Sequence, residues 1–169
     1  VIAGVDVAIG MLRVDHRWRP PAIVADALAL PFRDGVFDAV VAPFSLNHVD
    51  DPATAMREAA RTVRHGGWVL VSSYAADDAH PVKDAVEQVL RRHGWTPAPW
   101  HSWLRSHAIP RLATPELARR AAVDGGLVDV DVVARRVPFR DLGAAELVDW
   151  RMGMAQYATF VAGLDARLR

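Results

Sequence analysis

Short apolar runs alternate with helix-like spacing through about the first ninety residues of the chain. Such runs, bounded by turn residues, predict buried strands. They lie at Val1–Val5, Ala22–Ala25, Phe37–Ala42 and Trp68–Tyr74. Ala8–Val14 carries its apolar residues on one side and predicts a short helix between the first two strands. Because strand and helix patterns alternate, we predict a parallel sheet with crossover helices.

Clear start and stop signals surround the helix between the third and fourth predicted strands. Asp51 can cap it, and Pro52 suits the first helical position because the missing N–H would have no partner there. The apolar residues that follow recur at helical spacing. The pair Gly66-Gly67 is expected to end this helix, where a left-handed residue is often needed.

The pattern changes after the fourth predicted strand. Pro81–His93 has an apolar face and predicts a helix, and a second helix begins with the Thr114-Pro115 pair and ends at Gly125-Gly126. Valine and aspartate alternate in 127–133, which predicts a half-exposed strand near a sheet edge. From Ala144 to the C-terminus, the apolar stripe Leu147, Trp150, Met154, Tyr157 and Val161 predicts another helix.

Composition and charge narrow the class of protein. Half of the 169 residues are hydrophobic, and twenty basic residues balance twenty acidic ones. This balance argues against a strongly charged nucleic-acid or membrane surface, with a local patch and a homodimer left open. The chain has no cysteine, which excludes disulfides and thiolate metal sites. No apolar run approaches the length of a membrane helix, and we expect a cytoplasmic protein.

Two carboxylates mark the ends of the first two predicted strands. Asp6 follows the first strand and could accept hydrogen bonds from a ribose diol. Asp26 follows the second, where its carboxylate and the Ala27 N–H could bind the polar edge of an adenine. The alternatives are a helix cap or turn at Asp6 and an Asx-turn at Asp26.

Four passages of the chain together resemble the class I S-adenosylmethionine-dependent methyltransferases, in particular the small-molecule type. They are Gly4-Val5-Asp6 with Met11-Leu12; Asp26-Ala27 through Leu30-Pro31-Phe32 to Asp34-Gly35 and Phe37-Asp38; His48-Val49 with Asp51; and Glu58 with Arg61 to Gly67. The resemblance implies an α/β, Rossmann-like sheet with flanking helices and a helical cap, and S-adenosyl-L-methionine as cofactor.

The resemblance also assigns cofactor contacts to individual residues. Asp6 would hold the ribose, and Asp26 and Ala27 would bind the polar edge of the adenine. Val7 and Met11 would pack near the adenine, and Phe44 would lie beside the methionine part. His65 departs from the family pattern, which usually has proline before the two glycines, and we expect this to alter only a turn.

Candidates for chemistry on the methyl acceptor follow the third predicted strand. His48 is the best-placed base for an oxygen or carbon nucleophile; the alternative is a packed histidine that holds the loop. Asn47 could orient a substrate or serve as a turn residue. Glu58 lies on the following helix, where we interpret it as a structural hydrogen-bonding residue.

Aromatic residues of the second half could form a lid over an apolar or aromatic substrate. Trp100 and Trp103 are the predicted substrate contacts, with Trp95, His101 and His107 nearby, and ordinary packing is the alternative. Trp150, Met154 and Tyr157 are expected in the core or in a second wall of that pocket. Asp77, Asp78 and His80 predict a polar loop and a helix start, and we expect no metal site.

In the resembling family the sheet order is three-two-one-four-five-seven-six, and the first strand seen here corresponds to strand two. Strand one with its glycine-rich loop would precede Val1, and strand seven would follow Arg169. We therefore expect a single, partial domain over residues 1–169, with 75–113 and 138–169 as helical cap segments. Another chain could supply the missing strands, or Val1–Val5 could pair directly with Phe37–Ala42. We expect S-adenosylhomocysteine to bind this chain weakly or not at all.

The predicted function is S-adenosylmethionine-dependent methyl transfer to a small, apolar acceptor by the parent protein. The alternative is a catalytically inactive, methyltransferase-like domain that acts in binding or dimerisation. A nicotinamide dehydrogenase also uses an acid after its second strand, but the stretch from Asp26 to Phe32 and the paired glycines before Trp68 fit it poorly.

Overall fold

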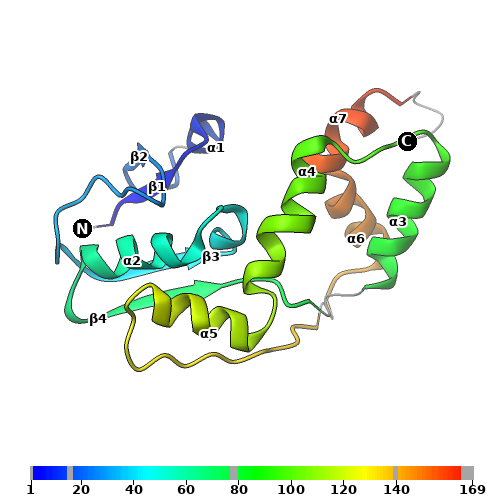
Figure 1. Cartoon of the computed structure of the whole chain (residues 1–169). Coiled ribbons are helices and arrows are strands. Elements are labelled where there is room, and N and C mark those ends of the chain that lie inside the picture. Colours follow the sequence, from blue (N-terminus) through cyan, green and yellow to red (C-terminus); the bar gives the residue numbers. More distant parts are fainter. Residues whose placement is uncertain (1, 15–16, 77–79, 139–140, 165–169) are drawn as a thin grey trace. The chain divides into compact units, whose positions relative to one another are not determined.

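The chain folds into two compact units in a computed structural model that describes residues 2–14, 17–76, 80–138 and 141–164 (Figure 1). We call Val1–Ala76 with His107–Ala134 the strand unit. Asp77–Ser106 with Arg135–Arg169 form the helical unit. The segments predicted as a cap, 75–113 and 138–169, supply most of the helical unit and part of the strand unit.

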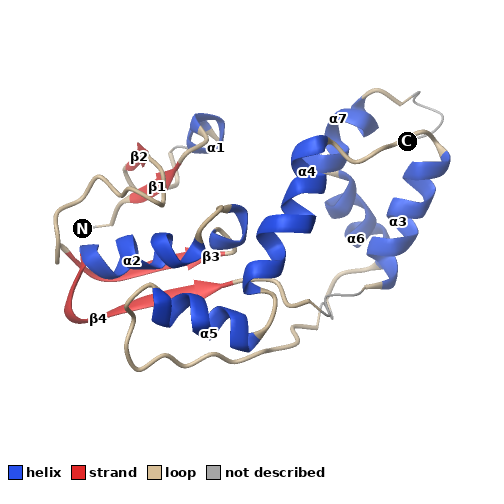
Figure 2. Cartoon of the chain, viewed as in Figure 1, coloured by secondary structure: helices blue, strands red, loops and turns tan. Residues whose placement is uncertain are grey.

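The strand unit contains two pairs of parallel strands (Figure 2). β1 (Gly4–Asp6) pairs with β2 (Ala22–Val24), and β3 (Phe37–Pro43) pairs with β4 (Val63–Ser72). The short helix α1 (Ile9–Arg13) follows β1. The predicted parallel pairing is thus confirmed, and all four strands overlap the predicted ranges.

The two strand pairs are separate sheets within the part of the chain that the structure describes. There, β1 is hydrogen-bonded only to β2, and β3 only to β4. Direct pairing of Val1–Val5 with Phe37–Ala42 is therefore wrong. Two short sheets in place of one are consistent with the predicted incomplete sheet.

The crossover from β3 to β4 runs through η1 (Leu46–His48) and helix α2 (Pro52–Thr62). As predicted, Asp51 caps α2: its carboxylate accepts hydrogen bonds from the Thr54 N–H at 3.0 Å and the Thr54 hydroxyl at 2.7 Å. The predicted helix end at Gly66-Gly67 is wrong, because the chain is already extended from Val63. Pairing of this segment with β3, beginning at Phe37, overrides the local glycine signal.

A hydrophobic core lies between one face of β3–β4 and the helices α2 and α5 (Pro115–Asp124). Met56 and Ala55 of α2 and Leu112 of the short helix η3 (Ile109–Leu112) are buried in it, with Ala42 and Val71 packed against it. The Thr114 hydroxyl caps α5 by accepting from the Leu117 N–H at 3.3 Å, as predicted. The opposite sheet face is apolar but exposed at Val41, Trp68 and Leu70.

The predicted strand at 127–133 is not formed; this segment is irregular. Leu127 and Val130, three residues apart, pack on the core, and Asp129 has a positive φ of 53° between them. This spacing departs from the alternation on which the prediction rested, because a strand presents every second residue to one face.

The helical unit consists of α3 (Pro81–Arg92), α4 (Pro99–Trp103), part of the π-helical segment η2 (Leu104–Ala108), α6 (Ala144–Met152) and α7 (Ala155–Ala162). Its core contains Val86, Leu90, Trp95 and Tyr157. The single helix predicted from Ala144 is interrupted at Gly153, which caps α6. No helix among the described residues is long and apolar enough to cross a membrane.

Candidate functional site

The carboxyl ends of the parallel strands carry most of the predicted site residues. Asp6 is the last residue of β1, and Asp26 follows β2 by two residues. Phe44 comes directly after β3, and Tyr74 follows β4 by two residues. In α/β sheets with parallel strands this edge is where ligands bind, because loops there are free to vary while the strands hold their ends in place.

Asp6 is half-buried, and its carboxylate is held by the backbone that leads into α1. Its Oδ1 atom accepts a hydrogen bond from the Ala8 N–H at 2.8 Å, and its backbone carbonyl accepts one from the Ala25 N–H at 3.2 Å. The turn that the sequence offered as an alternative is therefore present. It uses one carboxylate oxygen and is compatible with a ligand at the other, so a role at the ribose remains a prediction.

Asp26 is exposed and opens the loop that runs to Leu30. Its Oδ1 atom accepts from the Leu28 N–H at 2.9 Å, and its backbone carbonyl accepts from the Ala29 N–H at 3.1 Å. This is the Asx-turn that the sequence predicted as an alternative. Ala27 lies half-buried against the core beside it. The turn fixes the carboxylate next to the Ala27 backbone, as a two-point contact with an adenine edge requires.

The apolar residues predicted near the adenine lie at the surface. Val7 and Met11 are 71% and 65% exposed, although one directly follows Asp6 and the other lies on α1. Exposed apolar side chains beside a strand-end carboxylate are suited to the flat face of a base. The described contacts leave this role as a prediction.

Phe44 has an unusual backbone conformation for its residue type. Its φ is 51°, in the left-handed region that bulky side chains avoid at a cost of order 1–3 kcal/mol. Its N–H donates to the backbone carbonyl of Ser72 at 3.1 Å and to the hydroxyl of Ser72 at 3.2 Å. Its ring lies against that of Tyr74, with 4.7 Å between the ring centres and 31° between the planes.

Asn47 and His48 occupy the short helix η1, which packs against η3. Asn47 is buried, and its Oδ1 atom has no hydrogen-bond partner among the described residues. A buried, unpaired acceptor is costly, so a ligand or water is expected to bind it. His48 lies nearer the surface, and partial burial lowers its pKa below the usual value. It is therefore neutral at pH 7 and able to accept a proton.

An ion-pair network fixes the loop that follows Asp26. Glu58 of α2 accepts from the Leu30 N–H at 2.9 Å and pairs with Arg61 at 2.8 Å. The Arg61 guanidinium also pairs with Asp34 at 2.7 Å and donates to the backbone carbonyls of Phe32 and Leu30 at 2.7 and 2.9 Å. These contacts confirm that Glu58 is a structural residue. The role of Arg61 could have been inferred from its spacing of three residues after Glu58.

The tryptophans of the helical unit divide into core and surface residues. Trp95 is 3% exposed, donates from Nε1 to the Gln156 carbonyl at 3.0 Å and lies against Tyr157. Trp100 and Trp103 are 50% and 39% exposed. Packing therefore explains Trp95, whereas substrate contacts at Trp100 and Trp103 remain predictions. Trp150 was expected in the core or in a pocket wall; it is 55% exposed and is not part of the core.

The polar cluster predicted before α3 is only partly within the described residues. His80 caps α3 by accepting from the Val82 N–H at 3.3 Å, which confirms the helix start. Asp77 and Asp78 lie outside the described residues. In the described ranges, no group of three histidine, aspartate or glutamate side chains is placed to hold a metal ion.

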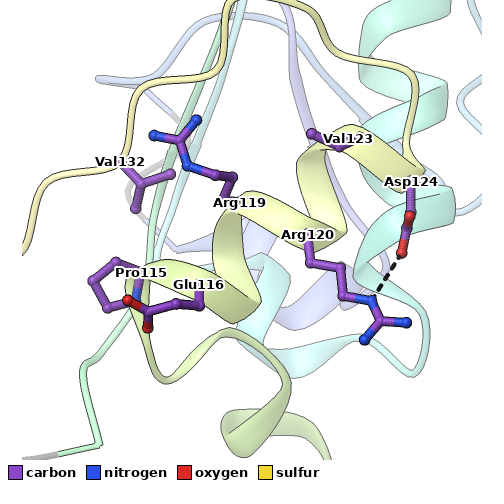
Figure 3. A pocket seen from close by; sticks show the side chains of 7 residues that line it. All are labelled: Pro115, Glu116, Arg119, Arg120, Val123, Asp124 and Val132. Atoms are coloured by element: carbon purple, nitrogen blue, oxygen red, sulfur yellow. Dashed lines mark ion pairs between the residues drawn. The ribbon is translucent and has the colours of Figure 1, made fainter.

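A surface hollow of about 520 Å³ lies along α5, and none of the predicted site residues lines it (Figure 3). Arg119, Arg120, Asp124 and Val132 are among its lining residues. Both arginines already have partners: Arg120 pairs with Asp124 at 3.8 Å, and Arg119 donates to the Val130 carbonyl. Nothing in the sequence had indicated this hollow, and its charges are largely satisfied within the chain.

Comparison with known sequences confirms the resemblance. Residues 1–71 match the family described as "Methyltransferase domain". Over 93 residues the chain is 36% identical to a demethylmenaquinone methyltransferase of Renibacterium salmoninarum, which covers 54% of this chain and 39% of the relative. Over 70 residues it is 43% identical to the protein of the same name from Mycolicibacterium gilvum; this match covers 41% of this chain and 31% of that relative. The chain thus spans less than half of these relatives' length.

Comparison with solved structures confirms the fold class. A crystal structure from Thermotoga maritima, described as a SAM-dependent methyltransferase and possible histamine N-methyltransferase, superposes with a TM-score of 0.50. The superposition covers 72% of this chain and 54% of that protein, at 21% sequence identity. At this sequence identity the likeness shows the fold alone, which is Rossmann-like.

Proposed function

We propose that this chain carries the adenosine-binding edge of an enzyme that transfers a methyl group from S-adenosylmethionine to a small-molecule acceptor. The observation that supports it most is the pair of carboxylates at the ends of the neighbouring parallel strands β1 and β2. Both lie within residues 1–71, the part that matches the methyltransferase family.

The residues at this edge fit the adenosine half of the cofactor. Asp6 and Asp26 are each fixed through Oδ1 by a backbone N–H, which orients the carboxylates before any ligand arrives. Asp6 would accept from the ribose hydroxyls, and Asp26 with the Ala27 N–H would bind the adenine edge. Val7 and Met11 would cover the base, and Phe44 would border the methionine part.

The bound cofactor would supply an electrophilic methyl group, and the chain's residues would orient the acceptor and manage its proton. His48 is the candidate base because its lowered pKa keeps it neutral at pH 7. An acceptor hydroxyl that reacts with the methyl group must lose a proton, which His48 could take. The unpaired Oδ1 of buried Asn47 could accept a hydrogen bond from the acceptor.

The acceptor proposed is a small, apolar molecule. The relatives named demethylmenaquinone methyltransferase support a small-molecule acceptor for the parent protein. Trp100 and Trp103 belong to the helical unit, where their contact with an apolar substrate stays a separate prediction from the sequence. A homodimer is compatible with this proposal, and dimerisation without ligand binding is the outcome that would favour the inactive-domain alternative.

If Asp6 binds the ribose, the affinity of the chain for a nucleoside should depend on the ribose hydroxyls. The chain should bind adenosine about tenfold more tightly than 2′,3′-dideoxyadenosine, because hydrogen bonds to a charged group contribute about 1.5–3 kcal/mol. Asp6→Asn should remove most of this preference. The measurement is an NMR titration of each ligand into each variant, which also detects millimolar dissociation constants.

Asp50→Asn is the matched control, because Asp50 is an exposed carboxylate of the same unit. Its preference for adenosine should equal that of the wild type. An Asp6→Asn variant that keeps the full preference would refute the ribose assignment.

A further inference from the structure

We propose that Tyr74 and Phe44 form an aromatic platform that binds a planar aromatic ring of the methyl acceptor. This inference rests on the proposed function and names a class of acceptor: molecules that present a flat aromatic ring. Tyr74 was not predicted as a site residue from the sequence.

The two rings lie together where paired strands end. Pro43 of β3 is the register partner of Ser72 of β4, so Phe44 and Tyr74 leave the sheet at the same edge. Their ring centres are 4.7 Å apart, and their planes are tilted by 31°. Both side chains are also substantially exposed, at 46% for Phe44 and 41% for Tyr74. Contacting aromatic rings that remain this accessible leave apolar surface for a third ring.

The backbone holds this pair in place before any ligand binds. Phe44 has a φ of 51°, which a phenylalanine adopts only where the surroundings enforce it. Here the Phe44 N–H donates hydrogen bonds to two acceptors on Ser72, the backbone carbonyl and the side-chain hydroxyl. Strained conformations of this kind concentrate at ligand sites. A ring fixed in advance loses little conformational freedom on binding, which favours affinity.

Two polar side chains close in sequence to the platform residues have an atom without a described partner. Asn47 follows Phe44 by three residues and has a buried Oδ1 atom without a partner among the residues described. The Ser73 hydroxyl, adjacent to Tyr74, is likewise buried and unpaired within those residues. The probe that tests the platform therefore carries a hydroxyl group as well as a flat ring.

The test compares 2-naphthol with its saturated analogue, decahydro-2-naphthol, by NMR titration of the full chain. The two probes share a carbon skeleton and a hydroxyl group, and only the first is planar and aromatic. We expect 2-naphthol to bind about fivefold more tightly, with the largest shifts at Phe44, Ser73 and Tyr74. Equal binding of the two probes, or shifts confined to other residues, would overturn the proposal.

Variants test the platform itself. Tyr74→Leu should weaken 2-naphthol binding about fivefold and leave decahydro-2-naphthol unchanged, whereas Tyr74→Phe should retain the preference. Trp68→Leu removes an aromatic residue that is 70% exposed on β4 and should have no effect. A loss of preference in Trp68→Leu as large as that in Tyr74→Leu would show nonspecific aromatic binding and refute the platform.

The same samples separate this inference from the proposed function. Titration with S-adenosylhomocysteine reports on the cofactor edge, and titration with 2-naphthol reports on the platform. Binding of 2-naphthol without S-adenosylhomocysteine would support an aromatic site and contradict the proposed cofactor. The reverse result would leave the cofactor proposal standing and refute the platform.

Discussion

Replacing Gly67 with alanine is expected to lower the free energy of unfolding by about 3 kcal/mol, because the added methyl group has no room. A Cβ atom at this position would lie 2.5 Å from the Asp38 carbonyl oxygen and 3.0 Å from the Arg64 carbonyl oxygen, and it would overlap the Val63 side chain. Two of these neighbours are backbone atoms that cannot rotate away. The strain would fall on β3–β4, which carries Phe44 and Tyr74 at its end.

The measurement is equilibrium unfolding in urea, followed by circular dichroism. Gly10→Ala is the matched control, because a Cβ atom there meets nothing within 4 Å and the residue lies in helix α1. That replacement should leave the free energy of unfolding unchanged or raise it by up to about 1 kcal/mol. Equal stability of Gly67→Ala and the wild type would mean that β3 and β4 are not packed as described.

Replacing Glu58 with alanine is expected to lower the free energy of unfolding by about 2–3 kcal/mol, the second large effect. Glu58 accepts from the Leu30 N–H and pairs with Arg61, and its side chain is only 20% exposed. Its removal would leave the Leu30 N–H and one side of the arginine unpaired. The loop after Asp26 would then lose its attachment to α2. Glu58→Gln should lower the free energy of unfolding by less, because an amide oxygen can still accept one of these hydrogen bonds.

The contribution of Glu58 should also depend on pH. The Arg61 guanidinium, with the Leu30 N–H, lowers the pKa of the Glu58 carboxyl below its usual value in the folded state. A lowered folded-state pKa means that the stabilisation is complete above about pH 5 and is lost as the pH falls through the folded-state pKa. The difference in stability between wild type and Glu58→Gln should therefore shrink in acid. A difference that stays constant down to pH 3 would contradict this ion pair.

Local signals predicted much of the fold. The cap-and-proline pairs at Asp51-Pro52 and Thr114-Pro115 begin helices as expected, because each cap bonds to a backbone N–H only three residues away. The apolar runs likewise predicted all four strands. These features depend only on residues a few positions apart, so the sequence alone is enough to predict them.

The wrong predictions depend on distant contacts. The end of α2 moved from Gly66 to Thr62 because the next residues pair with β3. The Val-Asp alternation in 127–133 predicted a strand, but two residues three positions apart turned out to pack on the core. Neither the partner strand nor the core surface can be read from the segment itself.

The candidate site also contains residues that the sequence could predict and residues that it could not. Asp6 and Asp26 could be found in the sequence because each ends a recognisable strand. The Phe44–Tyr74 pair could not, because its residues are thirty positions apart and meet only when β3 and β4 pair in register. The burial of Asn47 likewise depends on packing of η1 against η3.

The central claim is that the ends of β1 and β2 bind the adenosine part of a methyl-donor cofactor. The most direct test is an NMR titration of the isotope-labelled full chain with S-adenosylhomocysteine, alongside Asp6→Ala and Asp26→Ala. Of the two outcomes that the sequence left open, weak binding or none, we predict weak, saturable binding because backbone N–H groups already hold both carboxylates. The expected dissociation constant is about 1 mM, or about −4 kcal/mol. The shifts should centre on 6–8 and 26–28, and both variants should lose them. Shifts that do not saturate, or that persist in both variants, would contradict the account.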